Sequence, residues 1–177
     1  CARLAHDLAN VRVTEAAPKG WGRAVKKGIA ECRGNMVCYS NSARTAPKDL
    51  LLLILYSATN ADTVIKAERK IRDSTVRRLG SLIYNLECRA LFDMSYWDIN
   101  GTPKVFPRSF EALMHLQHDD DLIDLEFMVA CRDNDYPVLD VPILSARRHG
   151  GFSTTRIPSA WRLYAGAYSL WRSKQSL

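Results

Sequence analysis

The chain has 177 residues, of which 47% are hydrophobic and 25% charged, a composition that excludes a disordered chain and is long enough for one compact domain over residues 1–177. Its formal net charge of +6 suits an anionic ligand, but the basic residues are scattered and form no nucleic-acid recognition motif. The five cysteines lack metal-binding spacing and no apolar run could span a bilayer, so we expect a cytoplasmic domain, at most peripheral to a membrane.

Apolar spacing predicts alternating strands and helices in the first half of the chain. Residues 11–15 alternate apolar and polar side chains, as a short strand does, and residues 21–32 place apolar side chains at helical spacing. A short apolar run at 36–39 predicts a buried strand. Pro47 suits the first turn of a helix that runs to residue 57, and residues 61–67 predict another strand.

The second half continues the alternation. Ser74 is a candidate N-cap for a long amphipathic helix, and residues 96–107 contain glycine and proline and are predicted to form a loop. The pattern then predicts a helix over 122–133, a strand over 138–142 and an amphipathic helix within 156–174. This order is typical of an α/β layer architecture with a mixed, mainly parallel sheet and flanking helices.

Four segments follow one another in an informative order. Residues 18–35 hold P-K-G-W-G-R-A and then R-G-N, and Arg69 ends the segment 64–69. Residues 98–108 read D-I-N-G-T-P-K-V-F-P-R, and residues 124–154 run from D-L-E-F to G-F-S-T. These segments are similar to motifs of the family-2 glycosyltransferases related to dolichyl-phosphate mannose synthase.

That resemblance implies a GT-A-like (Rossmann-like) fold and covers the C-terminal two-thirds of the family's domain. It implies a mannosyltransferase-like enzyme that transfers a hexose from a nucleoside-diphosphate sugar, with inversion, to a polyprenyl (dolichyl-type) phosphate. The family's first strands, which form the base and ribose pocket, have no counterpart after Cys1, so we expect an N-terminally truncated domain.

This chain also differs from that family at the metal-binding motif. Its Asp-x-Asp, which holds Mg²⁺ or Mn²⁺ at the diphosphate, falls at Asn41, Ser42 and Ala43. We therefore expect no metal site beyond the carbonyl oxygen of Asn41. Arg44 is then a candidate to meet the donor diphosphate in place of a metal charge, and the alternative is loss of donor chemistry.

Two carboxylates are candidates for the catalytic base by resemblance. Asp98 lies in the glycine- and proline-containing loop, where the alternative is a side chain that only holds the turn. Glu126 has apolar neighbours on a helix, which suits a general base, and the alternative is a surface glutamate or one paired with arginine.

Basic residues are candidates for anion binding. Lys104 falls in the donor-side motif by resemblance, and Arg69, Arg78 and Arg148 would hold the acceptor phosphate. For Arg78 the alternative is a solvated helix face. The acidic run at 119–121 is better explained by a solvated loop that caps the next helix than by a metal site.

The last helix carries tryptophan and tyrosine on one face, which indicates core packing or a membrane-interface helix. Exposed sheet edges in a truncated domain would favour a homodimer. Two functions stay open: a glycosyltransferase, or a non-catalytic relative that keeps the fold as a binding or scaffold module.

Overall fold

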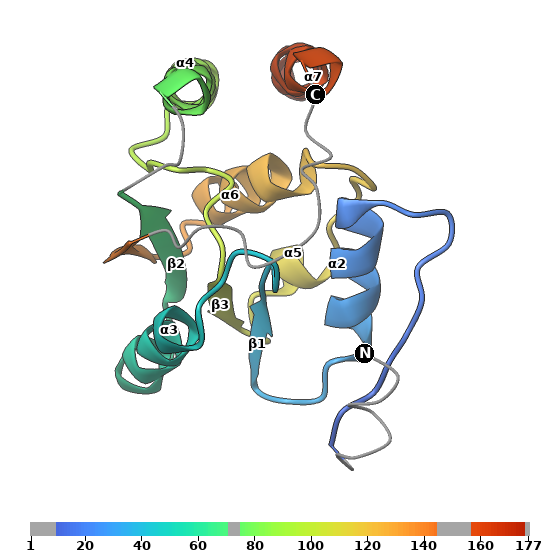
Figure 1. The fold of residues 1–177 in the computed structure, drawn as a ribbon, viewed down its shortest axis with the longest axis vertical. Helices are drawn as coiled ribbons and strands as arrows, with labels where there is room; N and C mark the ends of the chain where they lie inside the picture. Colours follow the sequence, from blue (N-terminus) through green and yellow to red (C-terminus); the bar gives the residue numbers. More distant parts are fainter. Residues whose placement is uncertain (1–9, 71–74, 145–156, 176–177) are drawn as a thin grey trace.

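Helices cover both faces of one four-stranded sheet in the computed structural model, which describes residues 10–70, 75–144 and 157–175 (Figure 1). The predicted alternation of strands and helices is confirmed over most of these residues. The described elements are α2 (Trp21–Glu31), β1 (Met36–Tyr39), α3 (Pro47–Thr59), β2 (Val64–Arg69), α4 (Thr75–Phe92), β3 (Lys104–Pro107), α5 (Glu111–Met114), α6 (Ile123–Asp133), β4 (Val138–Ile143) and α7 (Ile157–Gln175).

The sheet is mixed, with the strand order β1-β3-β2-β4. β3 pairs antiparallel with both of its neighbours, and β2 pairs parallel with β4 through partners such as Val64 and Val138. The expected parallel character therefore holds for strand direction, since β1, β2 and β4 all point the same way. It does not hold for the pairings, because β3 lies between two of those strands in the opposite direction.

Alternation along β3 separates two apolar cores. Val105 faces α3, where Leu53 packs on the inner residues of β2 and β4. Phe106 faces the other side and joins a larger core with Phe127 of α6 and Phe92 of α4. Among the described residues α3 alone supplies helical side chains to the first core, so their cover on that face of the sheet is thinner than on the other.

Two segments differ from the sequence-based expectations. Residues 11–15 are extended but form no strand, because they pair with no strand of the described sheet; instead Arg12 and Thr14 bind Glu31 at the end of α2. Residues 104–107 lie inside the predicted loop yet form β3, which is buried along its whole length. The predicted N-cap Ser74 lies outside the described residues.

α4 and α7 lie side by side at one end of the molecule, at the top of Figure 1. The Tyr164 hydroxyl donates to the Gly80 carbonyl at 2.7 Å, and the Tyr84 and Tyr164 rings meet edge to face. Their inner sides rest on the larger core through residues such as Cys88 and Ala167. Among the described residues no helix has the length and hydropathy to cross a bilayer.

Candidate functional site

The carboxyl ends of the three co-directional strands meet at one edge of the sheet. β1 ends at Tyr39 and β2 at Arg69, and the antiparallel β3 begins at Lys104 on the same edge. Ligands of open α/β sheets bind outside the carboxyl ends of the strands. This edge is therefore the place to test the predicted residues.

Arg69 and Asp98 form a two-pronged ion pair at that edge. Arg69 Nε donates to Asp98 Oδ2 at 2.7 Å, and an Arg69 terminal nitrogen donates to Oδ1 at 2.6 Å. The Arg69 backbone N–H also donates to Oδ2 at 3.0 Å. Burial on its own lowers the pKa of the Arg69 guanidinium, but the hydrogen bonds and charge of Asp98 outweigh it and raise that pKa. Arg69 is thus a fixed cation.

The loop that carries Asp98 is held in place by its neighbours. Asp98 has a positive φ of 48°, a conformation that aspartate tolerates better than most residues. The Ile99 N–H donates to Asn85 Oδ1 of α4 at 2.9 Å. A Cβ at Gly101 would lie 2.0 Å from the Ala67 carbonyl oxygen, so only glycine allows the loop to approach β2 this closely.

A surface depression of about 260 Å³ brings three of the predicted residues together. Arg69, Arg78 and Asp98 all line it, so two of the three candidate acceptor-side arginines and one candidate base are neighbours. The other lining residues come from β2, α4 and the loop before β3; they are Glu68, Lys70, Ser81, Leu82, Asn85 and Trp97. Three basic and two acidic residues line the depression; Arg69 pairs with Asp98 and Lys70 with Glu68, each at 2.6 Å, so one positive charge remains in excess, which suits an anionic group.

Two lysines form a buried charged layer beneath this edge. Lys66 of β2 and Lys104 of β3 are cross-strand partners, and both are fully buried. Lys66 Nζ lies 2.6 Å from Asp140 Oδ1 and donates to the Trp97 carbonyl at 2.6 Å, while Lys104 pairs with Asp124. Burial lowers the pKa of Lys104 even though Asp124 opposes that shift. Lys104 therefore sits in the interior, not in the depression.

Asp124 is the hub of the buried network and was missed by sequence reasoning. Its Oδ1 accepts from Lys104 and from the Tyr39 hydroxyl at 2.8 Å, and its Oδ2 accepts from Trp21 Nε1 at 3.0 Å. The network ties α6 to β3, β1 and α2. The available signal was a carboxylate among the apolar residues of the D-L-E-F segment, but its partners are distant in the sequence.

Glu126, the other candidate base, lies in a different environment from Asp98. Its two carboxylate oxygens accept the backbone N–H groups of Gln117 and His118 at 2.7 and 2.8 Å. Glu126 does not line the depression that holds Asp98. In this structure it stabilises the turn before α6.

The acidic run at 119–121 takes part in similar local contacts. Asp119 pairs with Arg23 and Lys26 of α2 at 2.6 Å each, and Asp120 Oδ1 accepts the Leu122 N–H at 3.0 Å. Gly20 and Gly22 fit tightly here, since a Cβ at Gly22 would lie 2.4 Å from the His118 carbonyl oxygen. The P-K-G-W-G segment therefore serves to seat α2 against this turn.

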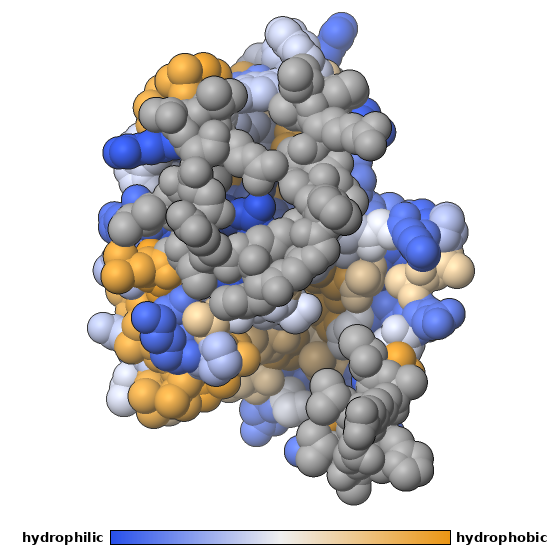
Figure 2. All heavy atoms as spheres, viewed as in Figure 1, coloured by the Kyte–Doolittle hydropathy of each residue, from blue (hydrophilic) through white to orange (hydrophobic). Residues whose placement is uncertain are grey.

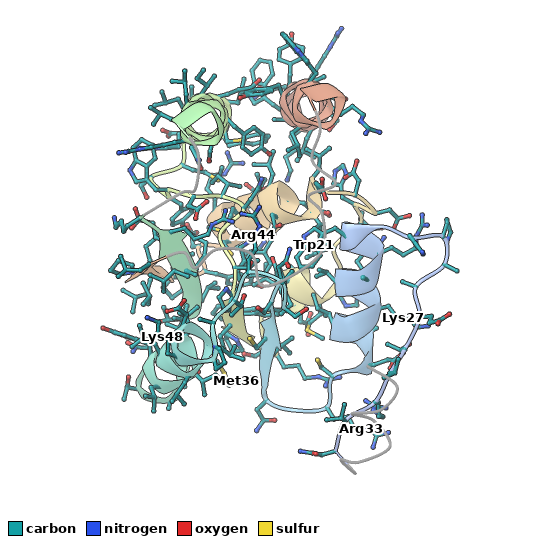
Figure 3. The ribbon with its side chains drawn as sticks, in the orientation of Figure 1. Trp21, Lys27, Arg33, Met36, Arg44 and Lys48 are labelled. Carbon is teal, nitrogen blue, oxygen red and sulfur yellow. The ribbon has the colours of Figure 1, made fainter. Side chains whose placement is uncertain are left out.

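The residues at the metal-motif position do not fit a divalent cation. Asn41 Oδ1 accepts the Ala43 N–H at 3.1 Å, and the Asn41 carbonyl accepts from the Arg44 and Thr45 amides. The turn offers no carboxylate, and the described part of the chain contains no cluster of three metal-ligating side chains. Figure 3 shows Arg44 above the end of β1, near the middle of the view. Arg148, the third predicted acceptor arginine, lies outside the described residues.

Comparison with solved structures identifies the fold. The chain is similar to a mycobacterial protein, with a TM-score of 0.66 and 15% identity over 92% of this chain and 52% of that one. It is also similar to glucosyl-3-phosphoglycerate synthase from Mycobacterium tuberculosis in complex with phosphoglyceric acid, with a TM-score of 0.64, 14% identity and coverage of 92% and 56%.

The same synthase solved with Mn²⁺, uridine diphosphate and glucosyl-3-phosphoglycerate gives a TM-score of 0.61 at the same identity and coverage. No protein-family model and no curated protein matches the sequence. The chain has a GT-A-like glycosyltransferase fold, as its motifs predicted, and it spans about half the length of these neighbours.

Proposed function

We propose that this chain is the acceptor-binding part of a glycosyltransferase domain, which moves a hexose from a nucleoside-diphosphate sugar to a phosphate-bearing acceptor. The narrower proposal is a polyprenyl phosphate acceptor. The observation that carries the proposal is the cationic depression at the carboxyl edge of a GT-A-like sheet, where Arg69 and Arg78 lie together. The free cysteines among the described residues, such as Cys88, suit a reducing cytoplasm.

Arg69 is well prepared to bind a phosphate. Asp98 and the Asn100 carbonyl accept three hydrogen bonds from its guanidinium, so little side-chain entropy is lost when a ligand meets the remaining terminal nitrogen. Arg78 is exposed on α4 and supplies a second cation to the same depression. Guanidinium groups meet phosphate oxygens through paired hydrogen bonds, whereas a lysine offers only a point charge.

A phosphate acceptor also fits the hydrogen bonding of the two candidate bases, whose carboxylate oxygens already have partners. Both oxygens of Asp98 accept from Arg69, and both oxygens of Glu126 accept backbone N–H groups. A hydroxyl acceptor needs a base to remove its proton. A phosphate monoester has a second pKa of about 6 and is already anionic at neutral pH, so it needs no base to remove a proton.

In the proposed step, a phosphate oxygen of the acceptor attacks the anomeric carbon of the donor. The bond from that carbon to the donor's diphosphate oxygen breaks, and the nucleoside diphosphate leaves with the electron pair. Asp98 would act here by positioning Arg69, which holds the nucleophilic phosphate. The sequence also predicts Asp98 or Glu126 as a catalytic base, and this step needs no base.

The proposal also assigns residues to the binding of the donor. Arg44 is the last residue of the turn after β1, where it would meet a diphosphate, and Asn41 would shape that turn by accepting a hydrogen bond from the Ala43 N–H. Lys104 is buried and paired with Asp124, so it would support this end of the sheet without touching the donor. The neighbour that binds uridine diphosphate does so with Mn²⁺, and the residues at 41–43 offer that ion no carboxylate.

The test combines thermal stability with product detection. The purified chain is titrated with orthophosphate, with uridine and guanosine diphosphates and with their sugars, each with Mn²⁺ or with a chelator. A ligand that binds only the folded state raises the melting temperature. We expect phosphate to raise it in the wild type and not in an Arg69→Ala, Arg78→Ala double variant. A wild type that responds to no phosphate or nucleotide would refute the proposal.

The lack of carboxylates at residues 41–43 favours a second candidate, a non-catalytic binding module. The two candidates share the acceptor site and differ in the donor site. Incubation with a nucleotide sugar and a short polyprenyl phosphate separates them. Formation of a glycosyl phosphate supports the enzyme, whereas phosphate binding without nucleotide binding or product supports the module.

A further inference from the structure

The outward faces of α4 and α7 carry large apolar side chains that nothing in the described structure covers. On α4 they fall on one side of the helix, opposite Tyr84 and Cys88, which face the core. Trp161 and Tyr168 of α7 extend the same end of the molecule, and Figure 2 shows apolar surface over α4 at the upper left. We call this surface the α4–α7 face; it consists of Leu79, Leu82, Ile83, Leu86, Trp161 and Tyr168.

We propose that the α4–α7 face is a docking surface for an anionic lipid bilayer. The proposal deepens the proposed function, since it places the phosphate acceptor in a membrane, although its test needs neither donor nor acceptor. Leucine and isoleucine on a helix face, with tryptophan and tyrosine beside them, are the side chains that enter the boundary between headgroups and acyl chains. Tryptophan and tyrosine favour that boundary because they are amphipathic.

Charge decides between a lipid surface and an uncharged partner. α4 and α7 together carry six basic residues and one acidic residue, Glu87, which accounts for most of the net charge of the chain. Arg78 of α4, one turn before Leu82, and Arg172 of α7, one turn after Tyr168, are exposed, whereas Arg162 lines a hollow with Asp119, Asp120 and Asp121. Basic residues beside an apolar helix face attract anionic lipid headgroups.

α3 provides an internal comparison. It exposes Leu51 and Leu55 at 57% and 58%, close to Leu79 and Ile83 of α4 at 59% and 50%. Its charged residues are one lysine and one aspartate, Lys48 and Asp49, so it has no basic excess. Apolar exposure alone therefore does not mark the α4–α7 face; the combination with positive charge does.

The position of the phosphate depression supports the same occupant. Leu82 belongs to the α4–α7 face and also lines the depression, and Arg78 lies one turn before it on α4. A headgroup phosphate between Arg69 and Arg78 would therefore have its acyl or prenyl chain beside Leu82. A soluble phosphorylated metabolite would make no use of this adjoining apolar surface.

Vesicle flotation tests the proposal with the full chain and no nucleotide. We expect the chain to float with vesicles of phosphatidylcholine plus phosphatidylglycerol, weakly with phosphatidylcholine alone, and less in high salt. The variant Leu79→Glu, Ile83→Glu should lose at least about tenfold in the bound-to-free ratio, because two carboxylates would enter the interface. The matched control on α3, Leu51→Glu, Leu55→Glu, should float like the wild type.

Circular dichroism of each variant confirms that it is folded, since all four positions are exposed. Equal losses in both double variants, or no flotation of the folded wild type, would overturn the proposal. A third result would also overturn it: sedimentation equilibrium in which the α4 variant alone changes the oligomeric state, with flotation unchanged. A second copy of the chain would then be the occupant of the α4–α7 face. Phosphate binding that needs Arg69 and Arg78 would survive these failures and leave the proposed function standing.

Discussion

Asp98 and Arg69 are each nearly removed from water, with side-chain exposures of 6% and 14%, so each depends on the other for its hydrogen bonds. Removing one partner of a buried ion pair costs more than the pair itself contributes, because the remaining charge is left without compensation. Asparagine tolerates the positive φ at this position, so Asp98→Asn removes charge without straining the backbone.

We predict that Asp98→Asn lowers the free energy of unfolding by about 3 kcal/mol, measured by urea denaturation. It should also weaken orthophosphate binding, since Arg69 loses its fixed orientation. The control is Arg78→Ala, whose exposed side chain should change stability by less than about 0.5 kcal/mol while it weakens phosphate binding. Unchanged stability in Asp98→Asn would contradict the structural role of the pair.

Because the thiol of Cys131 is buried, we expect the free energy of unfolding to depend on pH in the alkaline range. Burial raises the pKa of Cys131 from 9.0 to about 12, so the unfolded chain releases this proton above pH 9 and the folded chain keeps it. The unfolding free energy therefore falls as pH rises from about 9 toward about 12.

For this one thiol the loss at pH 10 is about 1.4 kcal/mol relative to neutral pH. We predict that Cys131→Ala, which adds a pH-independent cavity cost, loses less stability between pH 7 and pH 10 than the wild type does. Urea denaturation at both pH values measures the difference. Identical pH dependence in the two proteins would show that the thiol ionises as readily in the folded state.

At the scale of elements, α2 contains two glycines in opposite environments. A Cβ at Gly22 would lie 2.4 Å from the His118 carbonyl and 2.6 Å from the Asp120 carbonyl, both in the backbone of the turn before α6. A Cβ at Gly28 would meet nothing within 4 Å.

We predict opposite effects of alanine at these two sites. Gly22→Ala should lower the free energy of unfolding by about 1–3 kcal/mol, because backbone must move to admit the methyl group. Gly28→Ala should raise it by about 0.5–1 kcal/mol, since alanine favours the helix. Thermal melts of the two variants compare them directly. A stabilising Gly22→Ala would mean that α2 does not pack on this turn.

The elements that the sequence predicted best are those with local signals. β1 was predicted at its observed bounds, and α6 to within one residue, because apolar runs and helical spacing are properties of neighbouring residues. β3 was missed because Lys104 and two nearby prolines look like a loop. That lysine is buried only because Asp124, twenty residues later, reaches it.

The candidate site shows the same difference between features with a local sequence signal and features set by tertiary contacts. Arg69 and Asp98 were singled out from motif segments and Arg78 as a further candidate cation, and the structure places the three side by side in one depression. The saturation of Asp98 by Arg69 and of Glu126 by backbone amides was not foreseeable, since both depend on tertiary geometry. The catalytic roles of these residues, the single domain over residues 1–177 and the homodimer stay predictions.

Across the whole molecule, the two faces of the sheet differ in how firmly they are covered. α6 buries seven of its residues, whereas α3 buries only Asp49, Leu53 and Ser57. Local opening is easier where fewer apolar contacts must be broken. We predict that native-state hydrogen exchange is faster for the central amides of α3 than for those of α6. Equal protection would indicate that both helices open only when the whole domain unfolds.

The pairing of β2 with β4 also has a consequence during protein synthesis. Val64 emerges from the ribosome long before Val138, its partner in the parallel ladder, and α7 follows later still to cover the core beside α4. Contacts between residues so far apart form slowly, and unpaired strand edges are prone to aggregate while they wait. The nascent chain therefore exposes one edge of β2 until β4 has emerged, and part of its larger core until α7 is complete.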